Sequence, residues 1–74
     1  MFTAIIGFSV PNTSAVTINV FDHNGKLVAT PVDEKKPAGI YKVQFDATTL
    51  PSGIYFYRIL AGDFIQTKKM VLMK

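Results

Sequence analysis

Few side chains in this sequence could carry out chemistry, and His23 is central among them because it is the only histidine. Asp22, Asn24 and Gly25 resemble the opening of a calcium-binding loop, but a third ligand and the closing glutamate are missing. A nucleophile–base pair would have to combine a serine or threonine with an acid or a lysine, and His23 could pair with Ser52 only by coincidence of the fold. The chain has no cysteine, so it offers no thiolate zinc site and no disulfide. We therefore expect a protein that is not an enzyme and that binds no metal, cofactor or small-molecule substrate.

The formal net charge of +3 is confined to the C-terminal part of the chain. Residues 1–57 carry as many acidic as basic side chains, whereas Asp63 is the only acid that follows them. The basic side chains in that last part are Arg58, Lys68, Lys69 and Lys74. Nucleic-acid-binding surfaces show more basic residues, clustered on one face with aromatic residues between them. The charge therefore argues against a nucleic-acid partner and indicates either a solvated strand or a terminus that another protein contacts.

Hydrophobic residues alternate with polar ones in short runs that are separated by turn residues, and no helical periodicity is present. The expected strands cover residues 3–10, 15–21, 26–32, 40–46, 54–60 and 64–73, with a charged loop over residues 33–39. No run approaches the roughly 20 apolar residues of a membrane helix, and no signal-peptide core precedes the first strand. The spacing predicts one all-β sandwich domain of six or seven strands over residues 1–74.

Two turn signals refine the strand pattern. Asn24 and Gly25 form a strong hairpin signal, because both residue types tolerate a positive φ. Pro31 cannot donate a hydrogen bond to a neighbouring strand, so the run around it belongs at a sheet edge or at a bulge. The expected hairpin therefore joins residues 15–21 to an irregular edge strand.

Leu50, Gly53 and Tyr55 have the spacing of a tyrosine corner, in which a tyrosine hydroxyl near the start of a strand bonds to the backbone upstream. This structural corner is typical of Greek-key sandwiches. The buried face of residues 54–60 stays open, because Ile54 with Phe56 and Tyr55 with Tyr57 and Ile59 are both plausible core sets. A core role for these aromatic side chains is favoured over a carbohydrate-binding platform.

Four segments together resemble a known family. In chain order these segments are Val20–Val28, Phe45–Ala47, Leu50–Arg58 and Thr67–Lys74. They are similar to the type A C-terminal sorting domain of the type IX secretion system, and to the related Ig-like repeat of flagellar hook-capping proteins. The resemblance implies an Ig-like or fibronectin-III-like Greek-key β-sandwich of about seven antiparallel strands. The usual Asn-Pro-rich opening of the family is replaced here by the apolar residues 1–5.

The resemblance implies a non-catalytic domain that directs a cargo protein to the cell surface or the extracellular space. Its implied partners are outer-membrane secretion and shuttle proteins and a sortase. The residues that match the recognition elements of the family are Gly53, Tyr55, Thr67, Lys68, Lys69, Met70, Val71, Leu72 and Lys74. The alternative is a stand-alone extracellular module that self-associates into a filament or surface layer by pairing edge strands.

Overall fold

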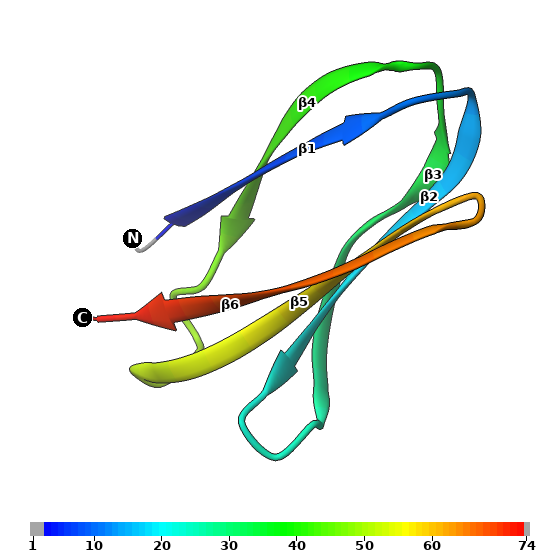
Figure 1. Ribbon diagram of the computed structural model, residues 1–74. Coiled ribbons are helices and arrows are strands. Elements are labelled where there is room, and N and C mark those ends of the chain that lie inside the picture. The colour runs from blue at the N-terminus through cyan, green and yellow to red at the C-terminus, as the bar shows by residue number, and fades with distance from the viewer. Residues whose placement is uncertain (1–2, 74) are drawn as a thin grey trace.

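The computed structural model describes residues 3–73, and among them it contains six strands and no helix (Figure 1). Met1, Phe2 and Lys74 lie outside the described residues. The strands follow one another along the chain as β1 (Thr3–Val10), β2 (Ser14–Asp22), β3 (Leu27–Lys36), β4 (Gly39–Asp46), β5 (Gly53–Ala61) and β6 (Phe64–Leu72). The all-β prediction is confirmed, and the described strands number six rather than about seven.

The strands form two antiparallel sheets that pack face to face. The larger sheet has the order β3-β2-β5-β6, and the smaller one consists of β1 and β4. The chain crosses between the sheets from β1 to β2, from β3 to β4 and from β4 to β5, so sequence neighbours pair only in the β2–β3 and β5–β6 hairpins. Figure 1 shows both ends of the described chain at the same end of the sandwich. The predicted sandwich is therefore an unequal one, with two strands facing four.

The predicted charged loop over residues 33–39 is wrong, because β3 continues through it to Lys36. Asp33 pairs with Thr17 and Lys35 pairs with Ala15 on β2. Charged side chains are tolerated there because β3 is an edge strand and these side chains reach solvent. Pro31 lies at a register shift between β2 and β3, so the prediction of an edge strand with an irregularity is confirmed.

The β2–β3 turn differs from a two-residue hairpin in which both central residues have a positive φ. Gly25 has a φ of 83°, and no described non-glycine residue has a positive φ. The amide of Gly25 donates to the carbonyl of Asp22 at 2.9 Å, and the amide of Asp22 donates to the carbonyl of Lys26 at 2.9 Å. Asn24 is therefore an ordinary turn residue, and Gly25 alone supplies the left-handed conformation that returns the chain to β3.

The core lies between the two sheets, and no described polar or charged residue is fully buried in it. Every second residue of β1 and β2 faces inward, as their alternating patterns predict. On β5 the inward set is Tyr55, Tyr57 and Ile59, because Ile59 pairs with the buried Ile18 of β2 and Tyr57 pairs with Val20. This register decides the question that the sequence of residues 54–60 left open.

Candidate functional site

The strand that contains most of the candidate recognition residues, β6, is an edge strand. It pairs with β5 along one side, and no other described strand pairs with its second side. Its backbone groups on that second side are a ready template for another strand. We call this second side of β6, together with the side chains of β6 on the outer face of the sheet, the recognition edge. The side chains on the outer face are Ile65, Thr67, Lys69 and Val71.

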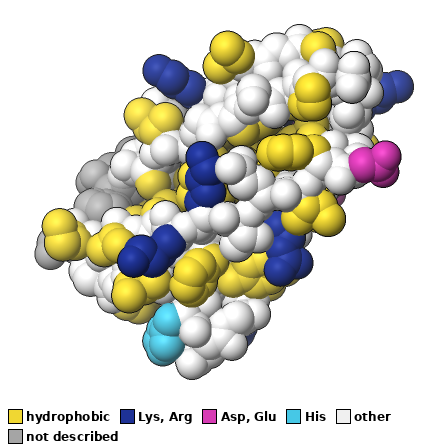
Figure 2. Space-filling view, viewed as in Figure 1, with side chains coloured by type: hydrophobic (Ala, Val, Ile, Leu, Met, Phe, Trp, Pro, Cys, Tyr) yellow, Lys and Arg dark blue, Asp and Glu magenta, His cyan; other side chains and the backbone are white. Residues whose placement is uncertain are grey.

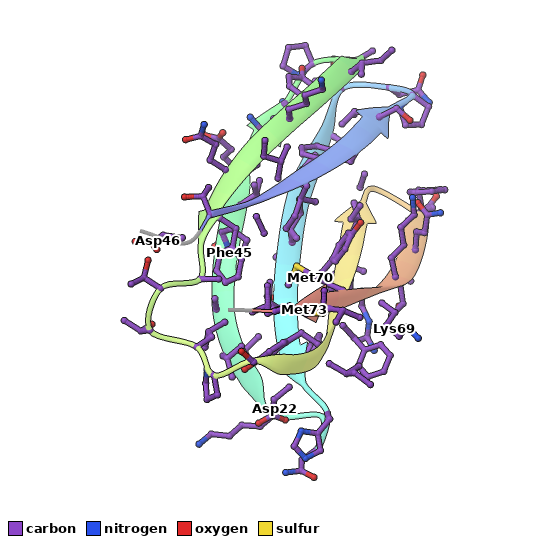
Figure 3. All side chains as sticks on the ribbon, turned by 90° about the vertical axis from the view of Figure 1, so that its left-hand side faces the viewer. Asp22, Phe45, Asp46, Lys69, Met70 and Met73 are labelled. Atoms are coloured by element: carbon purple, nitrogen blue, oxygen red, sulfur yellow. The ribbon has the colours of Figure 1, made fainter. Side chains whose placement is uncertain are left out.

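Side chains along β6 alternate between the interior of the sandwich and its outer face. Leu72 is 2% exposed and pairs with Gly53, and Met70 is half-buried opposite Tyr55. Lys69 and Val71 lie on the outer face and are exposed. Figure 3 shows Met70 between the two sheets and Lys69 pointing away from them. The candidate residues thus separate into an inward group that anchors β6 and an outward group that a partner can contact.

Lys68 is an exception among the inward residues of β6. Its position pairs with Tyr57, so it is on the same side of the sheet as the core, yet it is exposed. Gln66 is also inward by register and exposed. The two-stranded sheet therefore leaves the beginning of β6 uncovered, while its end packs on the core.

Tyr55 makes the hydrogen bond of a tyrosine corner. Its hydroxyl donates to the carbonyl of Pro51 at 2.8 Å, and its ring is buried. Leu50 is half-buried and packs against the core, and its amide donates to the carbonyl of Ala47 at 3.1 Å. The corner fixes the start of β5, and through the Tyr55–Met70 and Gly53–Leu72 pairs it supports the end of β6. Gly53 and Tyr55 therefore lie beside the recognition edge and support it from inside.

A second corner of the same kind precedes β4, and the sequence reasoning missed it. The hydroxyl of Tyr41 donates to the carbonyl of Pro37 at 2.5 Å, also four residues upstream. The ring of Tyr41 stacks on Phe8 with 5.4 Å between centroids, and the Lys36 ammonium lies 4.8 Å from its centroid. The signal that could have revealed it is a repeat, because residues 37–41 and 51–55 both read Pro-x-Gly-Ile-Tyr.

His23 and Ser52 both line a depression of about 200 Å³ between the β2–β3 turn and the corner before β5. The neighbouring carboxylate of Asp22 accepts the amides of Asn24 and Lys26, each at 2.9 Å. The bond from the Lys26 amide is the main cause that lowers the pKa of Asp22, and the Asn24 amide and nearby positive charge add to it. Asp22 therefore caps the turn with its carboxylate, as turn-forming aspartates do.

Residues 3–73 contain neither a metal-binding cluster nor a membrane-spanning helix. No group of three or more His, Cys, Asp or Glu side chains in that range could hold a metal ion. Nor does that part of the chain form a helix that is long and apolar enough to cross a membrane.

Comparison with known protein families gives a match that covers nearly the whole chain. The family model described as "secretion system C-terminal sorting domain" matches residues 3–73. No curated protein matches the chain, and no solved structure matches it either. The matched range includes all six strands, both corners and the recognition edge. The chain therefore belongs to the family of C-terminal sorting domains of the type IX secretion system.

Proposed function

We propose that this domain directs the protein that carries it through the outer membrane, and that the secretion machinery reads the recognition edge on β6. The observation that carries the proposal is the position of β6, which is the last described strand of a sorting domain and has one free side. A partner can bind such an edge by adding a strand and can gain specificity from the side chains beside it.

The outer face beside the free side of β6 supports this assignment. Val71 is 54% exposed and pairs with Ile54, which is 45% exposed, while Ile65 is 64% exposed. Lys69 lies between Val71 and Ile65 on the same face, opposite the half-buried Phe56. An apolar surface with a cation in it offers a partner both buried area and orientation. The protein that carries the domain would reach the cell surface or the extracellular space, where a sortase can act on it.

The inward residues take part indirectly. Leu72 and Met70 hold the end of β6 against β5 and the core, and Gly53 and Tyr55 form the other side of that contact. Their substitution would weaken recognition by loosening the strand rather than by removing a contact with the partner. Lys74 is proposed as part of the recognised terminus on the basis of its sequence, because it lies outside the described residues.

The test is the export of a reporter fused upstream of this chain in a bacterium that has a type IX secretion system. We expect the intact fusion in the medium or on the cell surface. Lys69→Glu with Val71→Glu should leave the reporter in the periplasm, because both changes place negative charge on the recognition edge. The matched control is Lys35→Glu with Leu27→Glu, on the opposite edge strand β3, where Leu27 is 52% exposed.

Equal export of the two double variants would contradict the proposal, as would unchanged export after deletion of residues 70–74. Deletion alone is less decisive, because it also removes the buried Leu72. The alternative of a self-assembling extracellular module stays a prediction. Sedimentation at micromolar concentration tests it, since a monomer would count against assembly by edge pairing.

A further inference from the structure

Strand β1 pairs with β4 on one side, and no other described strand pairs with its second side, which we call the free side of β1. This side differs from the other sheet edges of the described residues in having no protection against pairing. Edge strands usually carry charged residues or proline, which discourage the addition of another strand. The other three edge strands follow this rule: β3 has Pro31 and four charged residues, β4 has Lys42 and Asp46, and β6 has Lys68 and Lys69. Strand β1 has 8 residues, with no charge and no proline. Its composition is that of a strand with a neighbour on both sides.

A shallow depression of about 370 Å³ involves β1, its partner β4 and the beginning of β6. It is lined by three consecutive residues of β1, by three of β4 and by the uncovered beginning of β6; the full set is Gly7, Phe8, Ser9, Ile40, Tyr41, Lys42, Gln66 and Lys68. Figure 2 shows the face of the molecule that includes β1 and β6. On this face acidic side chains appear at one rim, and lysine and arginine side chains are spread across the surface. The depression therefore brings an edge strand, β1, together with two lysines, Lys42 and Lys68.

Two lysines border the depression from opposite sheets. Lys42 is on the outer face of β4, where it pairs with Gly7 of β1. Gly7 has no side chain that would separate Lys42 from the free side of β1. Lys68 is inward by register on β6 and exposed. The ion pair found in the described part of the chain is Lys36–Glu34, so neither Lys42 nor Lys68 has a carboxylate partner there.

We propose that the free side of β1 binds an extended acidic segment of another polypeptide as an added strand. The segment would continue the two-stranded sheet beyond β1 and would cover the exposed beginning of β6. Side chains of an added strand alternate between the two faces of the sheet. Carboxylates on one face would meet Lys68, and those on the other would meet Lys42 across Gly7. This site adjoins the beginning of β6 and includes Lys68, but its backbone contacts are with β1, and it does not depend on the proposed function.

A second copy of the chain fits this site less well than an acidic segment does. Antiparallel pairing of two β1 strands would place the same lysines of both copies around one interface. Like charges at an interface disfavour association, and the chain already carries a net charge of +3. The positive lining therefore selects a partner of opposite charge.

The test uses two synthetic peptides of the same length as β1, which has 8 residues. In one peptide two valines alternate with two glutamates, so that each face of the added strand carries glutamate, and in the other two valines alternate with two lysines. Fluorescence anisotropy measures the binding of each labelled peptide to the 74-residue chain. Amide chemical shifts in the NMR spectrum locate the peptide on the domain. We expect the glutamate peptide to bind, to shift the amides of β1, and to bind more weakly as ionic strength rises.

Lys68→Glu should weaken binding of the glutamate peptide about tenfold, because an attraction becomes a repulsion. The matched control is Lys35→Glu, at an exposed lysine on the outer face of β3, and it should leave binding unchanged. Far-UV circular dichroism verifies that both variants are folded. The NMR chemical-shift changes of the unaltered chain locate the peptide without any variant, so this result does not depend on whether the variants fold. Four results would overturn the proposal: no binding at millimolar peptide, equal binding of the lysine peptide, shifts confined to β3 or β6, or a dimer already paired through β1.

Discussion

At the scale of single residues, the fold depends on a few polar contacts that close its turns. Asp22 accepts two backbone amides, and Tyr55 and Tyr41 each donate to a carbonyl four residues upstream. Each tyrosine contact joins the first residues of a strand to the turn before it, and the Asp22 contacts join the end of β2 to the turn that leads to β3. Because the described core contains no fully buried polar group, these contacts at its margin fix where β3, β4 and β5 begin.

The two tyrosine corners should contribute unequally to stability. Tyr55→Phe removes a part-buried hydrogen bond and leaves the Pro51 carbonyl without that donor, so the free energy of unfolding should fall by about 1 kcal/mol. Tyr41→Phe removes a bond that is exposed to water, and its loss should be smaller, about 0.5 kcal/mol or less. Equilibrium unfolding in urea measures both. A larger loss for Tyr41→Phe would show that exposure does not govern the contribution of these corners.

At the scale of the elements, alternation divides the side chains of β6 between two environments. Its inward residues Met70 and Leu72 attach it to the core, and its outward residues Lys69 and Val71 are available to a partner. Because β6 has only one neighbouring strand, its attachment depends on β5 and on these inward side chains. As the proposed recognition element, β6 would be part of a folded domain while one side of its backbone stays accessible.

Adjacent truncations on β6 test this separation. Leu72→Ala should lower the free energy of unfolding by about 2–4 kcal/mol, because it removes a buried side chain and leaves a cavity. Val71→Ala should change it by about 0.5 kcal/mol or less, since this side chain is half exposed on the outer face. Urea unfolding of the two variants provides the comparison. Similar losses at both positions would mean that β6 in solution does not alternate with Leu72 inward and Val71 outward.

At the scale of the whole molecule, the unequal sandwich determines both stability and access. Two strands cannot cover four, so the beginning of β6 and the free side of β1 remain open. Two of the four strand pairs join distant parts of the chain: β1 pairs with β4, and β2 pairs with β5. A chain of this size with such long-range pairing has a small core and a slow search for its native contacts.

Folding kinetics should reflect this topology. We expect refolding in milliseconds to seconds, as for other small proteins with distant strand pairing. The free energy of unfolding should be about 3–5 kcal/mol, because few domains of this size exceed that value without disulfides or metals. Stopped-flow tyrosine fluorescence measures the rates, and their ratio extrapolated to water should agree with equilibrium unfolding. Refolding in microseconds would be inconsistent with pairing of β1 with β4 and of β2 with β5.

Local sequence patterns determined the strands, their turns and the family. Alternation of apolar and polar residues depends only on neighbours along the chain, so it located six strands, and the run of matching segments identified the sorting domain. The alternation pattern failed at residues 33–36, where charged residues continue β3. Pro31 indicated an edge strand, but alternation alone does not show how far such a strand extends into charged residues. The inward face of β5 was likewise undetermined until its register with β2 was known.

Only the tertiary structure decided which backbone edges are free and what surrounds them. The charge on residues 58–74 was evident in the sequence. The surroundings of two neighbouring lysines show this. Lys69 lies on the outer face because of the pairing of β6 with β5. Lys68 borders a depression beside β1 because of the packing of the two sheets. An edge is free when no other strand reaches it, and this depends on the arrangement of the whole chain. The sequence therefore determined what kind of domain this is, and the fold decided where it can be bound.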